Sequence, residues 1–290
     1  MLIDGSPYGV TTGPDDALWF TLVHEGRIGR VTPGEDPAIF RLDPADGRPT
    51  VITTGVDGAL WFTEFTGDRI GRITVDGTIT AFETASPYGI TAGPDGAMWF
   101  TQLQGDQIGR ITPTGEITRY PLATEGAMPS MIVTGPDGAL WFTLNQGNAI
   151  GRITVDGEAT RYALPTADAA PVGICAGPDG ALWFVEIGAG QVGRIGTSGT
   201  ITEFPLPDRA ARPHAIVTGR DGALWFTQWG SGTLGRITTE GEIEEYPLEG
   251  AEPHGLTAGP DGLIWVAMES GALVRHPPGL FPGSQGPGVF

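Results

Sequence analysis

Two histidines in this chain each follow a proline, and acidic residues accompany the second of them. His214 stands in "RPHAI" and His254 in "AEPHG", although the whole sequence contains only four histidines. Glu252 lies two residues before His254, and Glu269 follows in "WVAMES". A neutral imidazole can remove a proton near pH 7, and two carboxylates together with water can hold Mg²⁺. These residue types indicate a divalent-cation site with a general base, if the fold brings them together.

An internal repeat predicts the elements that position these residues. The tryptophan of "ALWFT" recurs about every 40 residues, at Trp19, Trp61, Trp99, Trp141, Trp183, Trp225 and Trp265. One copy reads "YGITA", "AMWFTQ", "IGRIT" and "ITRYPL", four runs of strand-forming residues separated by "GPDG", "QGD" and "PTGE". The sequence therefore predicts an all-β, seven-bladed β-propeller of four-stranded antiparallel blades. We expect a single domain over residues 1–290, with a Pro/Gly-rich tail at 276–290.

Two positions of the repeat vary while the others stay nearly constant. The residue after the opening proline forms a circle at one end of the predicted ring: Tyr8, Thr50, Tyr88, Ser130, Val172, His214 and His254. Only the last copy carries an acid four residues past its tryptophan, at Glu269. Because function in a repeat protein sits where copies differ, we expect Glu252, His254 and Glu269 to converge beside His214. The alternative is that the acids are solvated loop residues and that Pro-His belongs to a turn.

The constant positions are interpreted as structural. We expect the arginine of each Ile-Gly-Arg triplet to bind neighbouring carbonyls or turn aspartates, and the tryptophans to pack between blades. His24 and His276 occupy no equivalent functional position and are expected at the surface, whereas Cys175 in "GICAG" is expected to be buried. The last copy lacks a fourth strand, which the opposite terminus or the Pro/Gly tail could supply.

Composition excludes several classes of function. The net charge is −18 and all 16 basic residues are arginine, so nucleic acid and membrane surfaces are poor partners and no lysine chemistry is available. No apolar run approaches the length of a membrane span, and the N-terminus does not resemble a signal peptide. The single cysteine allows no internal disulfide and fits a reducing compartment. We expect a cytoplasmic monomer.

With "PYGIT", "RPHAI", "AEPHG" and "WVAME" in place, the sequence resembles the virginiamycin B lyase (streptogramin B lyase) family from about residue 5 to 276. The resemblance implies a Mg²⁺-dependent carbon–oxygen lyase that gives antibiotic resistance. Such a lyase linearises streptogramin B-type cyclic depsipeptides by elimination at the ring ester. The resemblance further implies that His254 is the base and that Glu252 and Glu269 are the metal ligands. It also implies that His214 and Tyr8 contact the substrate.

Two other functions remain open from the residues alone. A metal-dependent lactonase would use the same architecture to add water, but the chain lacks an evident Asp/Asn ligand set around the ring. A non-catalytic propeller that binds a ligand at the ring mouth is compatible with the tyrosine, serine and threonine members of the circle. No Gly-x-Ser-x-Gly elbow or partnered cysteine is found, so a hydrolytic nucleophile is not evident.

Overall fold

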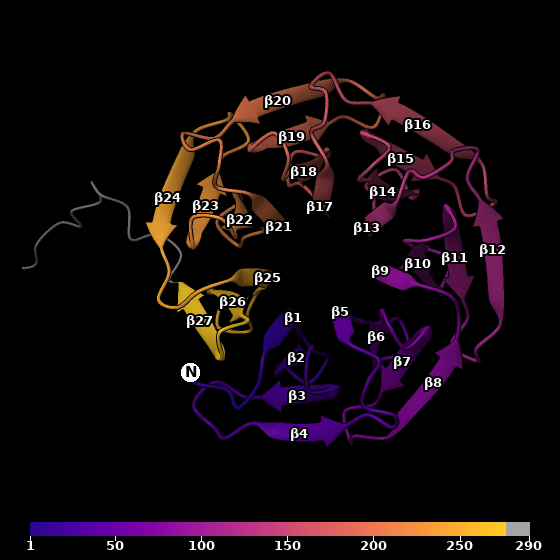
Figure 1. Cartoon of the computed structure of the whole chain (residues 1–290), viewed down its shortest axis with the longest axis vertical. Coiled ribbons are helices and arrows are strands. Elements are labelled where there is room, and N and C mark those ends of the chain that lie inside the picture. Colours follow the sequence, from indigo (N-terminus) through magenta and orange to yellow (C-terminus); the bar gives the residue numbers. More distant parts are fainter. Residues whose placement is uncertain (277–290) are drawn as a thin grey trace, which may run out of the picture.

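A computed structural model describes residues 1–276 as seven antiparallel sheets arranged in a ring around a central axis (Figure 1). Six sheets have four strands and the sheet β25–β26–β27 has three. Each sheet is one copy of the repeat, with its first strand innermost (Figure 1). The predicted seven-bladed propeller is confirmed, and blades 1 to 7 below are numbered in chain order.

The strands follow the four runs of each repeat. The innermost strands are β1 (Pro7–Thr12), β5 (Pro49–Thr54), β9 (Pro87–Ala92), β13 (Pro129–Thr134), β17 (Pro171–Ala176), β21 (Pro213–Thr218) and β25 (Pro253–Ala258). The tryptophan strands are β2 (Leu18–Leu22), β6 (Leu60–Glu64), β10 (Met98–Gln102), β14 (Leu140–Leu144), β18 (Leu182–Glu186), β22 (Leu224–Gln228) and β26 (Ile264–Met268). The third strands are β3 (Arg27–Val31), β7 (Arg69–Ile73), β11 (Gln107–Ile111), β15 (Ala149–Ile153), β19 (Gln191–Ile195), β23 (Thr233–Ile237) and β27 (Ala272–His276). The outer strands are β4 (Ala38–Arg41), β8 (Ile79–Glu83), β12 (Ile117–Pro121), β16 (Ala159–Ala163), β20 (Ile201–Pro205) and β24 (Ile243–Pro247).

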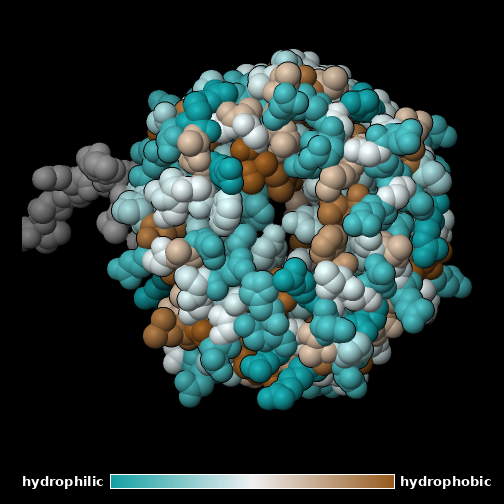
Figure 2. Space-filling view, in the orientation of Figure 1, coloured by the Kyte–Doolittle hydropathy of each residue, from teal (hydrophilic) through white to brown (hydrophobic). Residues whose placement is uncertain are grey.

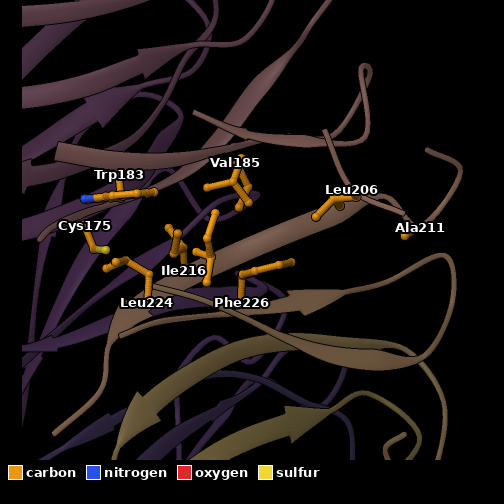
Figure 3. Close-up of a cluster of buried hydrophobic side chains, with 10 residues drawn as sticks. Cys175, Trp183, Val185, Leu206, Ala211, Ile216, Leu224 and Phe226 are labelled. Carbon is orange, nitrogen blue, oxygen red and sulfur yellow. The ribbon is translucent and has the colours of Figure 1, made fainter. Parts of the chain in front are cut away.

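Hydrophobic packing joins neighbouring blades. Trp183 and Val185 of β18 are buried against Ile216 of β21 and Phe226 of β22 in the next blade (Figure 3). Equivalent clusters recur around the ring, so the Trp-Phe pairs of blades 1 to 6 fill the space between neighbouring sheets. The glycine of each Ile-Gly-Arg triplet allows this packing. A Cβ at Gly151, for example, would overlap the ring of Phe142.

A cluster of aspartate, tryptophan and arginine marks the turn end of each of the first six blades. In blade 2, Trp61 Nε1 donates to Asp57 Oδ1 at 3.0 Å and Arg72 Nε donates to Asp57 Oδ2 at 2.7 Å. Blades 1, 3, 4, 5 and 6 repeat both contacts. The prediction that these arginines are structural is confirmed, and their partners are the turn aspartates.

A buried threonine links most blades to the next at the opposite end. The register of every innermost strand shifts after its opening proline. In blade 6, Thr227 Oγ1 accepts the N–H of Ala215 in its own blade and donates to the carbonyl of His254 in blade 7 at 2.8 Å. Thr21, Thr63, Thr101 and Thr143 make the same donation to the circle residue of their next blade. Val185 and Ala267 replace the threonine in blades 5 and 7.

The N-terminal residues close the ring. Leu2 forms a bridge to Ala272 on the free edge of β27, and Met1 and Leu273 exchange two backbone hydrogen bonds of 2.8 and 2.9 Å. Ile3 N donates to Gly271 O at 2.9 Å. Of the two closures considered from the sequence, the opposite terminus therefore supplies pairing for blade 7. The tail at residues 277–290 lies outside the described residues.

The surface of one face of the ring mixes hydrophilic and hydrophobic residues (Figure 2). The residues that the structure describes include no helix with the length and apolar character needed to cross a membrane.

Candidate active site

Backbone hydrogen bonds join the loop after the tryptophan strand to the start of the innermost strand in every blade. The N–H four residues past the tryptophan donates to the carbonyl of the residue before the opening proline. The pairs are Val23–Ser6, Phe65–Arg48, Leu103–Ser86, Asn145–Met128, Ile187–Ala170, Trp229–Arg212 and Glu269–Glu252. In blade 7 this 3.0 Å bond joins two glutamates, so the repeat itself places Glu252 and Glu269 side by side.

Glu252 has a left-handed backbone conformation that L-residues seldom adopt. Its φ is 58°, and five other residues at the same position, Arg48, Ser86, Met128, Ala170 and Arg212, have φ between 43° and 51°. The left-handed residue turns the chain into the innermost strand while its carbonyl still accepts the pairing hydrogen bond. The Glu252 side chain is exposed, whereas that of Glu269 is half-buried.

His254 is buried at the start of β25 and contacts Glu269. Its Nε2 lies 2.6 Å from Glu269 Oε2, a distance typical of an ion pair although the angles do not meet hydrogen-bond geometry. Burial lowers the pKa of His254, and the carboxylates of Glu269 and Glu252 partly oppose that shift. The imidazole is therefore neutral near pH 7, the form in which it can accept a proton.

Tyr8 and His214 complete an aromatic group around His254. The Tyr8 ring stacks on the His254 ring with centroids 4.4 Å apart, and the His214 ring meets the His254 ring edge-on at 5.1 Å. Burial lowers the pKa of His214 to about 3, with a smaller effect from His254. His214 therefore stays neutral. Its buried Nδ1 has no hydrogen-bond partner within residues 1–276, so it is available to a ligand.

The Tyr8 hydroxyl lies 3.2 Å from the hydroxyl of Tyr88, which belongs to blade 3. Burial raises the pKa of Tyr8 well above its usual value, and Tyr88 and Glu269 raise it further. Burial also raises the pKa of Tyr88. Both phenols therefore remain protonated, and the pair can offer one hydroxyl proton to a ligand.

His24 lies at the surface as expected, but it also contacts Glu269. Its Nε2 lies 2.6 Å from Glu269 Oε1, on the opposite side of the carboxylate from His254. The side chain is exposed, but it reaches from blade 1 across the closure of the ring. His276, the other histidine expected at the surface, instead packs against Tyr246 and Trp225 on the outside of blade 6.

Two adjoining cavities provide space for a ligand at this end of the ring. A cavity of about 250 Å³ follows the axis and is lined by innermost strands from all seven blades, with Tyr8, Tyr88 and His214 among its residues. A second cavity of about 250 Å³ shares Tyr8, Thr50 and Tyr88 with it and adds His24 and Glu269. His214, His24 and Glu269 therefore border these cavities, whereas Glu252 lines a separate groove with Arg212 and Trp229.

Sequence and structure comparisons assign this arrangement to a family. The family model described as "Virginiamycin B lyase family" matches residues 2–276. The chain belongs to the virginiamycin B lyase family. The resemblance proposed from the sequence is confirmed, and so is the carbon–oxygen lyase class at the level of this family.

Solved structures of virginiamycin B lyase cover almost the whole chain. The selenomethionine-substituted enzyme from Staphylococcus aureus is 44% identical and has a TM-score of 0.91, covering 95% of this chain and 97% of its own. A catalytically inactive histidine-to-alanine variant from the same organism, solved with quinupristin, is 44% identical with a TM-score of 0.90 and covers 94% of both chains.

Matches to curated virginiamycin B lyases are short. The protein from Saccharopolyspora erythraea is 62% identical over 39 residues, which is 13% of this chain and 13% of its own length. The alignment to these curated relatives therefore spans about one repeat.

The carboxylates of this virginiamycin B lyase family member fit a hard divalent cation. Mg²⁺ takes oxygen ligands and often binds through only one or two carboxylates, with water and substrate completing its shell. Glu252 and Glu269 lie on hydrogen-bonded neighbouring positions, and both influence His254 electrostatically. Residues 1–276 contain no group of three or more His, Cys, Asp or Glu side chains that could hold a metal on their own. Water or substrate oxygens would therefore supply the remaining ligands.

Proposed function

We propose that this chain linearises streptogramin B-type cyclic depsipeptides by elimination at the ring ester, as an antibiotic-resistance enzyme. The observation that carries the proposal is the 2.6 Å contact between a neutral His254 and the carboxylate of Glu269, which borders a cavity together with Tyr8 and His24. Membership of the virginiamycin B lyase family, with a relative solved in the presence of quinupristin, supports this choice of substrate class.

His254 is the proposed base. It takes the proton from the carbon α to a carbonyl, and the C–H electron pair forms a double bond to the β-carbon. The β-carbon–oxygen bond breaks, and the ester oxygen leaves as part of a carboxylate. No water is consumed, so substrate and product have the same mass. Neutral His254 suits this step because a base must be unprotonated before it acts.

Glu252 and Glu269 are the proposed ligands of Mg²⁺. Mg²⁺, when bound there, supplies Lewis-acid stabilisation of negative charge on a carbonyl oxygen. Glu269 also contacts His254, so its carboxylate favours the protonated form that the imidazole reaches after proton removal.

His214 and Tyr8 are the proposed substrate contacts. The unpartnered Nδ1 of His214 and the Tyr8–Tyr88 hydroxyl pair are the neutral polar groups beside the base. Neutral donors and acceptors suit a depsipeptide, whose ring carries amide and ester groups rather than charges.

Mass spectrometry tests the reaction. Incubation with a streptogramin B and Mg²⁺ should give a ring-opened product of unchanged mass, and EDTA should suppress it. A gain of one water would instead identify a lactonase or esterase reaction. No turnover, together with binding that survives His254→Ala, would identify a non-catalytic binding propeller.

We further propose that the enzyme acts as a cytoplasmic monomer. Cys175 is a buried free thiol, and burial raises its pKa to about 12, so it is suited to persist as a thiol. Light scattering of the purified protein at micromolar concentration should give the mass of one chain, and a doubled mass would contradict the monomer.

A further inference from the structure

His24 lies in a loop whose position is set by blade 1. Val23 N donates to Ser6 O at 3.0 Å, and the neighbouring Glu25 carboxylate accepts the backbone N–H of Ser6 at 3.1 Å. Leu42 N donates to Gly26 O at 3.0 Å on the far side of the loop. These contacts hold the backbone on both sides of His24, so its imidazole is presented to blade 7 by an anchored segment.

The contact between His24 and Glu269 requires one tautomer of the imidazole. An ionised carboxylate only accepts hydrogen bonds, so His24 Nε2 must carry the hydrogen that points at Glu269 Oε1. His254 Nε2 lies at the same 2.6 Å distance from the other oxygen. The Glu269 carboxylate therefore lies between two imidazoles, and of these His24 meets hydrogen-bond geometry.

No other blade has an imidazole at this position. The residue five places past the tryptophan is Thr66, Gln104, Gln146, Gly188, Gly230 or Ser270 in blades 2 to 7. Histidine occurs only in blade 1, which is the blade that borders the glutamate of blade 7 across the ring closure. The one histidine at this loop position therefore occurs in the blade that borders the proposed metal ligand Glu269.

We propose that His24 is a positioning residue that orients the Glu269 carboxylate for metal binding and thereby for catalysis. The inference rests on the proposed function, since it assumes that Glu269 is a metal ligand. Residues that hydrogen-bond to metal ligands commonly affect metal affinity by about 10- to 100-fold. His24 does not touch the substrate in this role and acts only through Glu269.

Calorimetric titration of Mg²⁺ into the substrate-free protein tests the proposal without relying on activity. His24→Ala should weaken Mg²⁺ binding by about 10- to 100-fold. His24→Gln keeps an N–H donor that can reach a carboxylate and should recover most of the affinity. Gln104→Ala removes the residue at the same loop position of blade 3, which borders no proposed ligand, and should bind as the wild type does.

A double-mutant comparison shows whether His24 acts through Glu269. His24→Ala combined with Glu269→Gln should bind Mg²⁺ no more weakly than Glu269→Gln alone, because the residue that His24 positions is already lost. Affinity losses that add would overturn the proposal. Wild-type affinity in His24→Ala, with weakened affinity in Glu269→Gln, would overturn it while leaving the proposed function intact.

A second measurement separates failure of this inference from failure of the proposed function. If the wild-type protein binds no Mg²⁺, the metal assignment and the positioning role proposed for His24 are both overturned, and thermal unfolding of the two single variants and the double variant then tests only the contact between His24 and Glu269. Shifts in Tm that fall short of additivity by about 2 °C would support the positioning contact. Additive shifts would overturn it.

Discussion

The two ends of the ring differ in how strictly they keep the repeat. At the turn end, blades 1 to 6 each carry the same cluster of aspartate, tryptophan and arginine, with tryptophan-to-aspartate distances of 2.9 to 3.1 Å. At the other end, the circle of residues after the prolines changes from blade to blade, and only blades 6, 7 and 1 supply the imidazoles and carboxylates described above. The comparison teaches that the repeated end holds the sheets together and that the varied end carries chemistry.

Replacing His254 is the strongest test of this division. His254→Ala should lower turnover of a streptogramin B by about 10³-fold, because general-base catalysis contributes about 10² to 10⁴. Ser130→Ala changes the same circle position in blade 4 and should leave turnover near the wild-type value. Initial rates followed by mass spectrometry measure both variants. Equal losses in the two would break the comparison, since the whole circle would then matter.

Glu186 refines the comparison, because it lies at the varied end but points into the protein. It is fully buried, Gln191 donates to its Oε2 at 2.7 Å, and burial raises its pKa from 4.5 to about 7. The folded state therefore holds this proton more tightly than the unfolded state does. The stability that the neutral carboxyl provides is complete below pH 4.5 and is lost as the pH rises through about 7.

Glu186→Gln should remove this pH dependence. Relative to the wild type, the variant should therefore be more stable at pH 8 than at pH 5, by about 2.5 kcal/mol in the free energy of unfolding. Urea unfolding at the two pH values measures the difference. Glu64, at the same position of blade 2, pairs with Arg69 at 2.6 Å, so Glu64→Gln should instead destabilise the protein at both pH values. The same sign for both substitutions at pH 8 would contradict this account.

A substitution at the turn end should affect stability and leave activity unchanged. Asp57→Ala leaves Trp61 Nε1 and Arg72 without their shared acceptor and should lower the free energy of unfolding by about 2 kcal/mol. Asp261→Ala should lower the free energy of unfolding by less. Asp261 accepts from Trp265 as Asp57 accepts from Trp61, but Arg275 of blade 7 is exposed. Urea unfolding and turnover rates distinguish the outcomes. A turnover rate that falls more than twofold in Asp57→Ala would show that the turn end contributes to catalysis, and would contradict the comparison.

The buried threonines give the smallest and most selective effect. Thr227 holds the carbonyl of His254, and Thr101 makes the equivalent bond to Ser130. Thr227→Val and Thr101→Val should each cost about 1 kcal/mol of stability. Only Thr227→Val should also slow turnover, by about 10-fold, because it releases the strand that positions the base. Unfolding curves and initial rates of the pair measure this, and equal rates would refute the positional effect.

The sequence predicted the fold because the repeat encodes it locally. Each copy contains its own turn residues and a tryptophan that is followed by phenylalanine in the first six copies, so the strands, the sheets and the packing between sheets follow from one unit. The contact between His254 and Glu269 was predictable for the same reason, whereas the exposed Glu252 side chain lines a separate groove. Equivalent residues of equivalent blades must face the same end of a ring, and the structure places Glu269 against His254.

The sequence did not predict the contacts that cross the closure of the ring. His24 and Glu269 are 245 residues apart, and nothing in the loop "LVHEGR" indicates which blade it will border. The pairing of Met1–Ile3 with β27 uses backbone groups, which carry no side-chain signal. Tyr88 was recognised as a circle member but not as the partner of Tyr8, because the contact skips blade 2.

The closure of the ring also has a consequence for when the protein can work. Tyr8 and His24 come from the first blade to leave the ribosome, and Glu252, His254 and Glu269 come from the last. A nascent chain that has folded six sheets holds only two of these five groups, so activity requires the closed ring. A circular permutant opened between β16 and β17 would make the two halves of the site neighbours in the chain and could be assembled early in translation.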